Sequence, residues 1–457
     1  MSEQIGGKIR VLQAAKSLGL GGTEKTLQIY TRSLNKDWFD VSVCGFLEGG
    51  VRGDQLRDEG YDVFVAGGSQ DAISRYLRKK KFHIVHVHRH GQEAEVVMAA
   101  KAAGVPVIVE TSVFGRPDFG PAQDAIDVTC HISKMTAIRY WAWTKISDKE
   151  FRRRCRVLYY PIEMESMAGA AVTPSEIEGL RERLGISEGA RVIGRIGRPD
   201  ATKWAVPFII KMVRRLVRSV PDVVYAAMGA PDELKRAAKR AGLENHFAFA
   251  EPSADAREVT TFYRLLEVMP YASIGESFGL VVAEGMGMGL PVVVLSTPMR
   301  DNAQIELVDH GRTGLVAHDA KGCANAVARL LADPGLSERL GRAAQEKVRE
   351  HYAAERVVRS LENLYADLLE RKCPGAGRII QGWERGGAVQ PTLDEVAAFR
   401  EEYPIRLRTG IGQPQHLPIW LYEHILLNYK FHQAGARSLS LLRAGKKQLR
   451  SLRSSQK

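Results

Sequence analysis

Two cations stand in a glycine-containing loop near the middle of the chain. Arg198 and Lys203 are five positions apart, and their loop follows a strand-like run at residues 191–196. In an open α/β sheet, ligands bind beside the carboxyl ends of the strands, so this loop is placed to meet one. A planar guanidinium and an ammonium point charge together suit a pyrophosphate. On spacing alone, a solvated basic loop is the more frequent alternative.

Two glutamates, Glu276 and Glu284, form a second group with possible chemistry. On one helix they would lie about 12 Å apart along the axis. A pair of glycosidase carboxyl groups needs about 5 to 9.5 Å, so that chemistry is disfavoured. Gly279 instead predicts that Glu276 ends a loop and that Glu284 lies in the following helix. The amides at residues 278–280 would then face an anion. Charged residues on two ordinary turns are the alternative.

A glycine-rich turn, residues 19–22, follows a strand-like run near the N-terminus and opens a helix. Gly21 and Gly22 allow the backbone to approach a ligand, and the free N–H groups of the helix attract a phosphate. Glu24 occupies the third glycine position of a dinucleotide fingerprint, and no acidic residue is well placed to bind a ribose further on. The motif is therefore a weak dinucleotide signature, with a tight strand–helix turn as the alternative.

Ligands for a metal are not evident. The chain has no Asp-x-Asp motif, and its five cysteines are too far apart in the sequence for a metal knuckle. Their odd number also argues against a disulfide framework. We expect no metal and no cofactor, and reduced thiols. The cysteines are Cys44, Cys130, Cys155, Cys323 and Cys373.

The elements that would position these residues follow one pattern, repeated twice. Apolar strand-like runs alternate with amphipathic helical stretches over the first 165 residues, and the alternation restarts after about residue 190. Strands without strict polar alternation indicate parallel sheets covered on both faces. The order predicts two doubly wound, Rossmann-like domains facing a central cleft. A capping box at residues 173–176, with Pro174 inside it, marks a new helix between them.

The net charge of +12 over 457 residues calls for an acidic partner: nucleic acid, a phosphorylated small molecule or an anionic membrane. Seven Lys and Arg, with no acidic residue, fall in residues 431–457, where leucines at helical spacing fit a basic amphipathic helix. A disordered tail is the alternative. No uninterrupted apolar stretch or signal-peptide pattern is evident, so we expect a cytoplasmic protein that binds the inner face of the membrane peripherally.

Residues 271–293, which contain both glutamates, closely resemble the signature of family-4 glycosyltransferases. The motifs at residues 21–24, 197–203 and 361–369 fall in the family's order, and the resemblance covers roughly residues 8 to 371. It implies a GT-B fold and a retaining, metal-independent enzyme that uses a nucleotide-sugar. We accordingly expect an acceptor domain at 1–170 and a nucleotide-sugar domain at 171–355. A helix at 356–372 would pack back on the first domain, and a helical extension would cover 373–457.

The resemblance also implies roles for the candidate residues. Arg198 and Lys203 would neutralise the donor diphosphate, Glu276 would hydrogen-bond the transferred sugar, and Glu284 would bind the ribose. Further donor contacts would come from the two helix starts, at Gly21, Gly22, Ser277, Phe278, Gly279 and Leu280.

Two positions depart from the family pattern. Many relatives carry a histidine at the end of the fifth strand of the first domain, where this sequence has Ser112. His88, after the fourth strand, is the candidate catalytic replacement, with a structural or exposed histidine as the alternative. Trp204 stands where glycine is usual.

The sequence thus predicts a hexosyltransferase-type enzyme. It would move a sugar from a nucleotide-diphosphate donor to a glycan or lipid-linked acceptor, in cell-surface polysaccharide or glycolipid synthesis. The alternatives are a basic nucleic-acid-binding protein, which lacks a recognisable motif here, and an NAD-dependent oxidoreductase.

Overall fold

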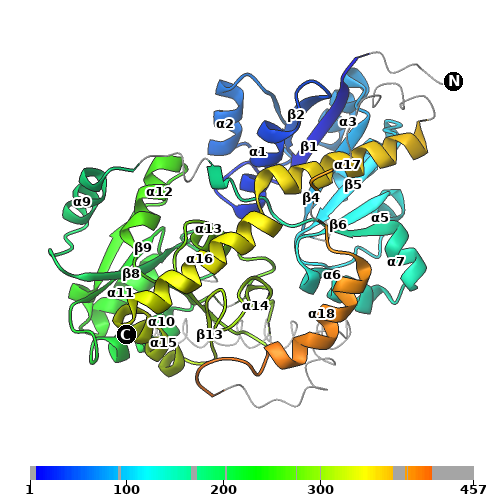
Figure 1. The fold of residues 1–457 in the computed structure, drawn as a ribbon. Coiled ribbons are helices and arrows are strands. Elements are labelled where there is room, and N and C mark those ends of the chain that lie inside the picture. Colours follow the sequence, from blue (N-terminus) through cyan, green and yellow to red (C-terminus); the bar gives the residue numbers. More distant parts are fainter. Residues whose placement is uncertain are drawn as a thin grey trace, which may run out of the picture.

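The computed structural model describes residues 7–90, 94–165, 172–200, 203–273, 275–298, 300–373, 386–388 and 390–413. Within them the chain forms two α/β halves built on parallel strands, blue to cyan and green to yellow in Figure 1. The predicted α/β class with two doubly wound halves is confirmed.

The N-terminal half contains a seven-stranded parallel sheet in the order β3-β2-β1-β4-β5-β6-β7. Because β1 pairs with both β2 and β4, the order reverses beside β1, as in doubly wound folds. The central strands β4 and β5 are buried along their whole length, and polar side chains such as His86, Arg89 and Glu110 are buried beside their aliphatic residues. The strands are β1 (Ile9–Ala15), β2 (Phe39–Gly45), β3 (Asp62–Val65), β4 (Ile84–Arg89), β5 (Val107–Ser112), β6 (Val128–His131) and β7 (Cys155–Val157).

The helices described in this half surround the sheet or connect its strands. They are α1 (Gly22–Ser33), α2 (Val51–Asp58), α3 (Gln70–Lys80), α4 (Glu95–Ala102), α5 (Pro121–Ala125), α6 (Lys134–Thr144) and α7 (Asp148–Arg154).

The C-terminal half repeats the topology. Two three-stranded parallel sheets, β10-β9-β8 and β11-β12-β13, are joined by a parallel bridge between Ile193 and Val268. The strand order therefore reverses between β8 and β11, which places a ligand crevice at their carboxyl ends. The strands are β8 (Arg191–Ile196), β9 (Val223–Met228), β10 (Phe247–Ala250), β11 (Met269–Tyr271), β12 (Val292–Leu295) and β13 (Leu315–Ala317).

The helices of this half begin with the predicted capping box. Thr173 and Glu176 cap each other's backbone, and Pro174 occupies the first turn. The helices are α9 (Pro174–Arg183), α10 (Val206–Leu216), α11 (Asp232–Arg240), the short 3₁₀ helix η1 (Glu244–His246), α12 (Ala256–Leu265), α13 (Leu280–Gly287), α14 (Gln304–Leu307), α15 (Ala320–Ala332) and α16 (Pro334–His351).

Two further helices connect the halves. The helix α17 (Ala354–Lys372) runs from the second half onto the first (Figure 1), where Glu362 accepts a hydrogen bond from the amide of Asn35. The helix α18 (Leu393–Arg406) pairs Asp394 with Arg152 of α7 at 2.9 Å and Arg406 with Asp309 at 2.8 Å. Both helices therefore hold the two halves in one arrangement.

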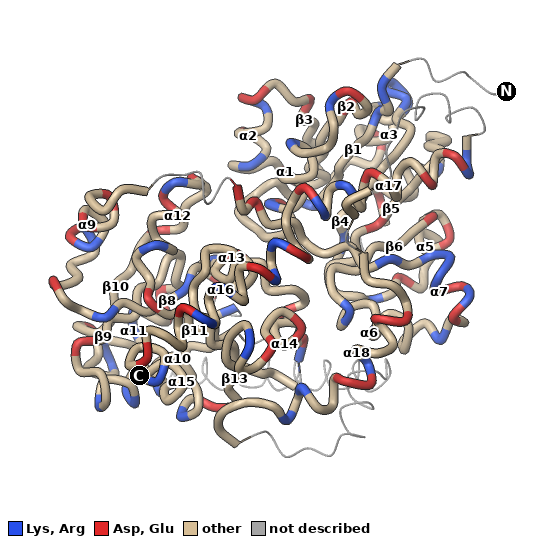
Figure 2. The backbone as a smooth tube through the Cα atoms, viewed as in Figure 1, with Lys and Arg blue, Asp and Glu red and all other residues tan. Residues whose placement is uncertain are grey.

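The charge of the described surface is mixed: Figure 2 shows Lys and Arg interspersed with Asp and Glu over both halves. The basic tail predicted at residues 431–457 lies outside the described residues. Among the residues that are described, no helix is long and apolar enough to cross a membrane.

Three buried histidines of the N-terminal sheet predict acid sensitivity. Burial lowers the pKa of His88 and His131 to about 3, and it holds the pKa of His86 well below its usual value. The unfolded chain binds these protons near pH 6.5 and the folded chain does not, so stability falls as the pH drops through this window. At about pH 5 we expect His88 and His131 each to lower the free energy of unfolding by about 2 kcal/mol, and His86 to act in the same direction.

Thermal unfolding at several pH values measures this effect. The Tm of wild type should drop between neutral and mildly acidic pH, and His131→Leu should reduce the drop. An identical drop in wild type and variant would contradict the assignment to His131.

Candidate active site

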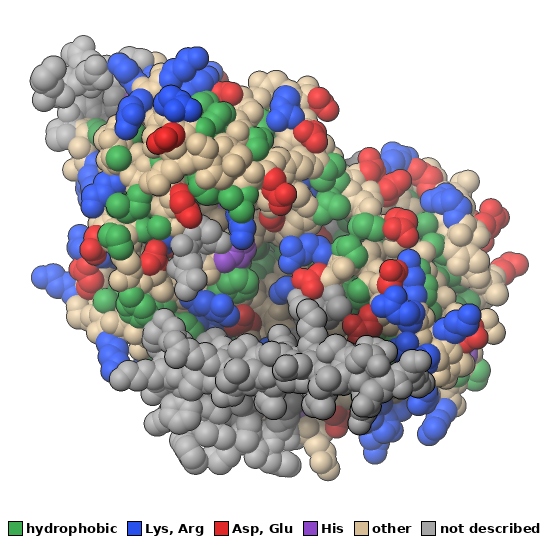
Figure 3. Space-filling view, turned by 180° about the vertical axis from the view of Figure 1, so that it is seen from behind, with side chains coloured by type: hydrophobic (Ala, Val, Ile, Leu, Met, Phe, Trp, Pro, Cys, Tyr) green, Lys and Arg blue, Asp and Glu red, His purple; other side chains and the backbone are tan. Residues whose placement is uncertain are grey.

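A cavity of about 290 Å³ lies between the two halves and is lined from both. In the space-filling view of Figure 3, basic side chains and a histidine lie in the hollow between the lobes. The residues from the first half include Gly21, Gly22, Lys25, Arg52, His90 and Tyr160, and those from the second include Arg195, Arg198, Lys203, Glu276, Ser277, Phe278, Gly279, Leu280 and Glu284. Apart from His88, the structure thus brings every predicted site residue to one cavity.

The loop that carries Arg198 and Lys203 packs against a buried arginine. The guanidinium of Arg195, at the end of β8, lies between the rings of Trp204 and Tyr271, 4.4 Å and 4.0 Å from their centroids. It also donates to the carbonyl of Ala272 at 2.8 Å. The indole N–H of Trp204 donates to the carbonyl of Arg198 at 2.7 Å, so Trp204 restrains the backbone at Arg198. Arg195 was not among the residues predicted from the sequence, although a charged residue inside an apolar strand was the available signal.

Replacing Arg195 tests this support. Arg195→Lys keeps the charge but loses the planar stacking on two rings. We expect the free energy of unfolding to fall by about 2 kcal/mol, the value of a desolvated cation–π contact. Chemical denaturation followed by tryptophan fluorescence measures it, with Arg236→Lys on the exposed face of α11 as the control. Equal stability of the two variants would contradict the role of the stack.

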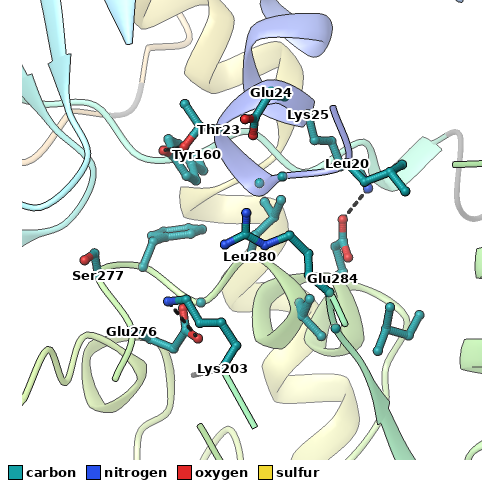
Figure 4. Close-up of a pocket in the computed structure, with 18 of the residues that line it drawn as sticks. Leu20, Thr23, Glu24, Lys25, Tyr160, Lys203, Glu276, Ser277, Leu280 and Glu284 are labelled. Carbon is teal, nitrogen blue, oxygen red and sulfur yellow. Dashed lines mark hydrogen bonds and ion pairs between the residues drawn. The ribbon is translucent and has the colours of Figure 1, made fainter. Parts of the chain in front are cut away.

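Glu276 is held at the opening of the cavity by two hydroxyl groups. Tyr271 and Ser273 donate to its Oε1 atom at 2.9 Å and 2.7 Å. Burial raises the pKa of the Tyr271 phenol, which therefore remains a donor. The ammonium of Lys203 lies 3.8 Å from the same oxygen and donates to the carbonyl of Gly275 at 3.3 Å. The carboxylate and the cation of the loop are consequently one unit, as Figure 4 shows.

The start of α13 faces the same space. Gly279 precedes this helix with a φ of +99°, a conformation that favours glycine, and a Cβ there would lie 3.2 Å from Leu307. Glu276 is thus in the loop and Glu284 in the helix, in agreement with the prediction. The carbonyl of Ser277 accepts a hydrogen bond from the hydroxyl of Ser133 at 2.7 Å. This bond joins the loop before α13 to the first half.

The start of α1 lies opposite. A Cβ on Gly22 would lie 3.5 Å from Leu280, so the first turns of the two helices are in close proximity. Gly21 is the residue before α1 and lines the cavity. Two helix N-termini therefore converge on one space, and each offers unpaired N–H groups and a partial positive charge.

An ion pair joins Glu284 of the second half to the first half. The Glu284 carboxylate pairs with the ammonium of Lys25 from α1 (Figure 4), and it accepts a hydrogen bond from Tyr263 at 2.7 Å. Lys25 lines the cavity but was not predicted from the sequence, because only the tertiary fold brings α1 to α13. Arg52 also lines the cavity; burial lowers its pKa, and its Nη1 donates to Gln28 at 2.7 Å.

His88 lies elsewhere. It is 2% exposed within the N-terminal half and does not line this cavity, and its Nε2 atom is 2.9 Å from the amide oxygen of Gln13. Ser112 is buried at the end of β5, where it is in register with Arg89 of β4 and His131 of β6. The histidine that does reach the cavity is His90, with its ring 5.4 Å from that of Phe114.

Three comparisons bear on this cavity. Residues 190–333, which carry most of its second wall, match the family model described as glycosyl transferases group 1. The chain is 26% identical over 350 residues to the D-inositol 3-phosphate glycosyltransferase of Xylanimonas cellulosilytica, covering 74% of this chain and 80% of that one. The fold is similar to a glycosyltransferase from Rickettsia africae, with a TM-score of 0.67 and 16% identity, over 79% of this chain and 99% of that one.

The fold is also similar to Anabaena HepE, solved in complex with UDP and glucose. The TM-score is 0.65 at 17% identity, over 79% of this chain and all of that one (100%). The two-domain architecture is therefore that of GT-B glycosyltransferases, which confirms the predicted fold class. The chain carries a group 1 glycosyltransferase domain, and the protein is an enzyme that transfers sugars.

Proposed function

We propose that the protein is a retaining glycosyltransferase of the family-4 type that takes its sugar from a nucleoside diphosphate sugar. The observation that carries this proposal is that Arg198, Lys203, Glu276, Glu284 and the N-termini of α1 and α13 converge on one cavity. Cations and helix N-termini suit a diphosphate, while carboxylates suit the hydroxyl groups of a sugar and a ribose.

The leaving group determines how the reaction is assisted. Breaking the glycosidic C–O bond places negative charge on the diphosphate, and Arg198 and Lys203 together with the first turns of α1 and α13 would stabilise that charge. These groups are held in place before the reaction, so little reorganisation is needed. We propose that they serve without a metal ion, so that a chelator should leave the rate unchanged.

Glu276 would hold the transferred sugar. Because Tyr271 and Ser273 fix one oxygen of its carboxylate, the group can accept a sugar hydroxyl in one orientation. With the sugar held against the diphosphate, the acceptor would attack the face from which the nucleotide leaves, which retains the anomeric configuration.

Glu284 would accept hydrogen bonds from the ribose hydroxyl groups. Removing a charged acceptor costs about 1.5 to 3 kcal/mol. We therefore expect Glu284→Gln to weaken binding of the nucleotide by about tenfold or more, with a smaller change in kcat. Isothermal titration with the product nucleotide measures this, with Glu267→Gln as the control. Unchanged affinity would place the ribose elsewhere.

For the acceptor, we propose a glycan or a lipid-linked glycan of cell-surface polysaccharide or glycolipid synthesis. The basic residues at 431–457 support a peripheral contact with anionic lipid. The name of the relative from X. cellulosilytica supports a phosphorylated polyol as a second candidate. Flotation with anionic liposomes, with and without residues 431–457, tests the membrane contact, and equal flotation would refute it.

The donor is tested by incubating the protein with UDP-, GDP- and ADP-sugars and measuring nucleotide release, with and without chelator. Release from one class of donor is expected, and NMR of the product should show the anomer of the donor. Folded protein that releases no nucleotide from any donor would overturn the proposal, and inverted product would overturn the retaining mechanism.

A further inference from the structure

The backbone of Glu276 is held by a loop that comes later in the chain. The amide of Glu276 donates to the carbonyl of Asp301 at 2.9 Å, and its carbonyl accepts a hydrogen bond from the amide of Ala303 at 2.9 Å. Glu276 and Asn302 thereby form a parallel bridge. The loop that provides these bonds, residues 296–303, connects β12 to α14. The position of Glu276 therefore depends on what holds this loop.

A buried arginine of the first half contacts this loop. The guanidinium of Arg139, on α6, pairs with the carboxylate of Asp301, and its Nη1 atom donates to the carbonyl of Phe114 at 2.7 Å. The side chain of Arg139 is 2% exposed and that of Asp301 is 20% exposed, so solvent ions screen this pair only weakly. Arg139 thus fixes the residue whose carbonyl bonds to the amide of Glu276.

The carboxyl group of Asp301 remains ionised in this environment. Burial raises its pKa, but the positive charges of Arg139 and Arg116 outweigh burial and lower the pKa of Asp301 below its usual value. The hydroxyl of Ser277 also donates to Oδ2 of Asp301 at 3.4 Å. Because Ser277 follows Glu276 in the chain, Asp301 contacts this segment with both its backbone and its side chain.

The start of α6 contacts the same segment at a second point, since the hydroxyl of Ser133 donates to the carbonyl of Ser277. The first half therefore holds both the residue after Glu276 and the loop that bonds to its backbone. A buried ion pair often contributes little net stability compared with apolar side chains of similar volume. A planar guanidinium that donates to two acceptors does fix their relative orientation. The pair of Arg139 and Asp301 is thus better suited to orienting Glu276 than to stabilising the fold.

We propose that Arg139 is a positioning residue for the transfer reaction, which through Asp301 orients the backbone of Glu276 and so directs its carboxylate toward the sugar. The inference rests on the proposed function, in which Glu276 holds the transferred sugar. Arg139 does not line the cavity between the two halves, so it acts through Glu276 and not on the substrate. Because Arg139 belongs to the first half, the carboxylate is aligned only when α6 contacts the loop of residues 296–303.

Arg139→Lys tests this role while keeping the positive charge beside Asp301. Lysine cannot donate to Asp301 and to the carbonyl of Phe114 with one planar group. We expect kcat for nucleotide release, with the donor that the panel identifies, to fall about 10-fold to 100-fold, and the affinity for the product nucleotide to change by less than about twofold, because a small misplacement of a reacting group affects mainly the rate. Isothermal titration measures the affinity. An unchanged kcat, or an equal loss of affinity, would overturn the positioning role.

Asp301→Asn is the second variant, and it decides the question if the first does not fold. Asparagine keeps the size of the side chain and the carbonyl that bonds to Glu276, but it removes the charge. We expect kcat to fall about tenfold, as for one lost hydrogen bond to a charged group. Arg191→Lys is the matched control, because Arg191 also bonds to a carboxylate, that of Glu267 at 2.8 Å, and to a carbonyl, that of Leu331 at 2.9 Å, but at the amino end of β8. Equal kcat of Asp301→Asn and the control would overturn the proposal.

A double variant shows whether Arg139 acts through Glu276. The effects of two residues that act through one contact do not add. In a Glu276→Gln enzyme we therefore expect Arg139→Lys to lower kcat by less than about twofold. The same fold-loss in both backgrounds would show that Arg139 acts independently of Glu276 and would overturn the proposal.

The single variant Glu276→Gln separates this inference from the proposed function. If Glu276→Gln keeps the kcat of wild type, the proposed contact between Glu276 and the sugar is wrong, and the positioning role of Arg139 is wrong with it. If Glu276→Gln loses activity while Arg139→Lys and Asp301→Asn keep that of wild type, only the positioning role is wrong and the proposed function stands.

Discussion

Lys203→Met is expected to lower kcat for sugar transfer by about 100-fold to 1000-fold, the loss seen when one preorganised group that stabilises developing charge is removed. Methionine keeps most of the length of the side chain and removes the ammonium, which lies 3.8 Å from Glu276 in the cavity between the two halves. The effect should fall on kcat more than on the KM of the donor, because the charge on the diphosphate grows only as the bond breaks.

Steady-state release of nucleotide, with the donor identified by the panel, measures this loss. Lys101→Met, on the exposed surface of α4, is the matched control and should behave as wild type. A Lys203→Met enzyme with wild-type kcat would show that the diphosphate is not bound at the loop of residues 197–203.

Glu276→Gln is expected to lower kcat by about 100-fold, because a neutral amide is a weaker acceptor for a sugar hydroxyl than a carboxylate. The amide also places an N–H₂ group where Tyr271 and Ser273 now donate to an oxygen, or forces it to face the sugar. The first orientation loses the two hydrogen bonds that align the side chain, and the second loses the acceptor that faces the sugar.

The comparison with Tyr271→Phe makes this prediction specific. Loss of the phenol leaves the carboxylate in place but less restrained, so we expect a loss of about tenfold, equivalent to about one hydrogen bond. Glu338→Gln, exposed on α16, is the control. A Glu276→Gln enzyme more active than Tyr271→Phe would contradict direct contact between Glu276 and the sugar.

The local part of the proposed donor site could be predicted because it depends on short stretches of chain. Gly279 requires a left-handed backbone, which ends the loop of Glu276 and starts the helix of Glu284. Arg198 and Lys203 follow a strand that is recognisable from its apolar run. In each case neighbouring residues determine the geometry, so the spacing in the sequence was sufficient.

His88 shows where this reasoning failed to place a residue. Its position after a parallel strand was consistent with the donor cavity, but the carboxyl edge of the sheet is wide enough for two cavities. The cavity that the end of a strand reaches depends on the strand order, which places β4 beside β1. It also depends on Tyr365 of α17, which packs against this part of the sheet and bonds to Gln13 of β1. Neither fact can be derived from the residues around position 88.

The sequence alone determined the local motifs, because each is a property of adjacent residues. These are the glycines at 21–22, the cations at 198–203, the carboxylates at 276–284, and the alternation of strands and helices that predicts parallel sheets. The tertiary structure alone decided that Lys25 pairs with Glu284, that Arg195 lies over the rings of Trp204 and Tyr271, and that Gln13 links Tyr365 to His88. These contacts join elements far apart in the chain, and their distances depend on how the two halves and α17 pack.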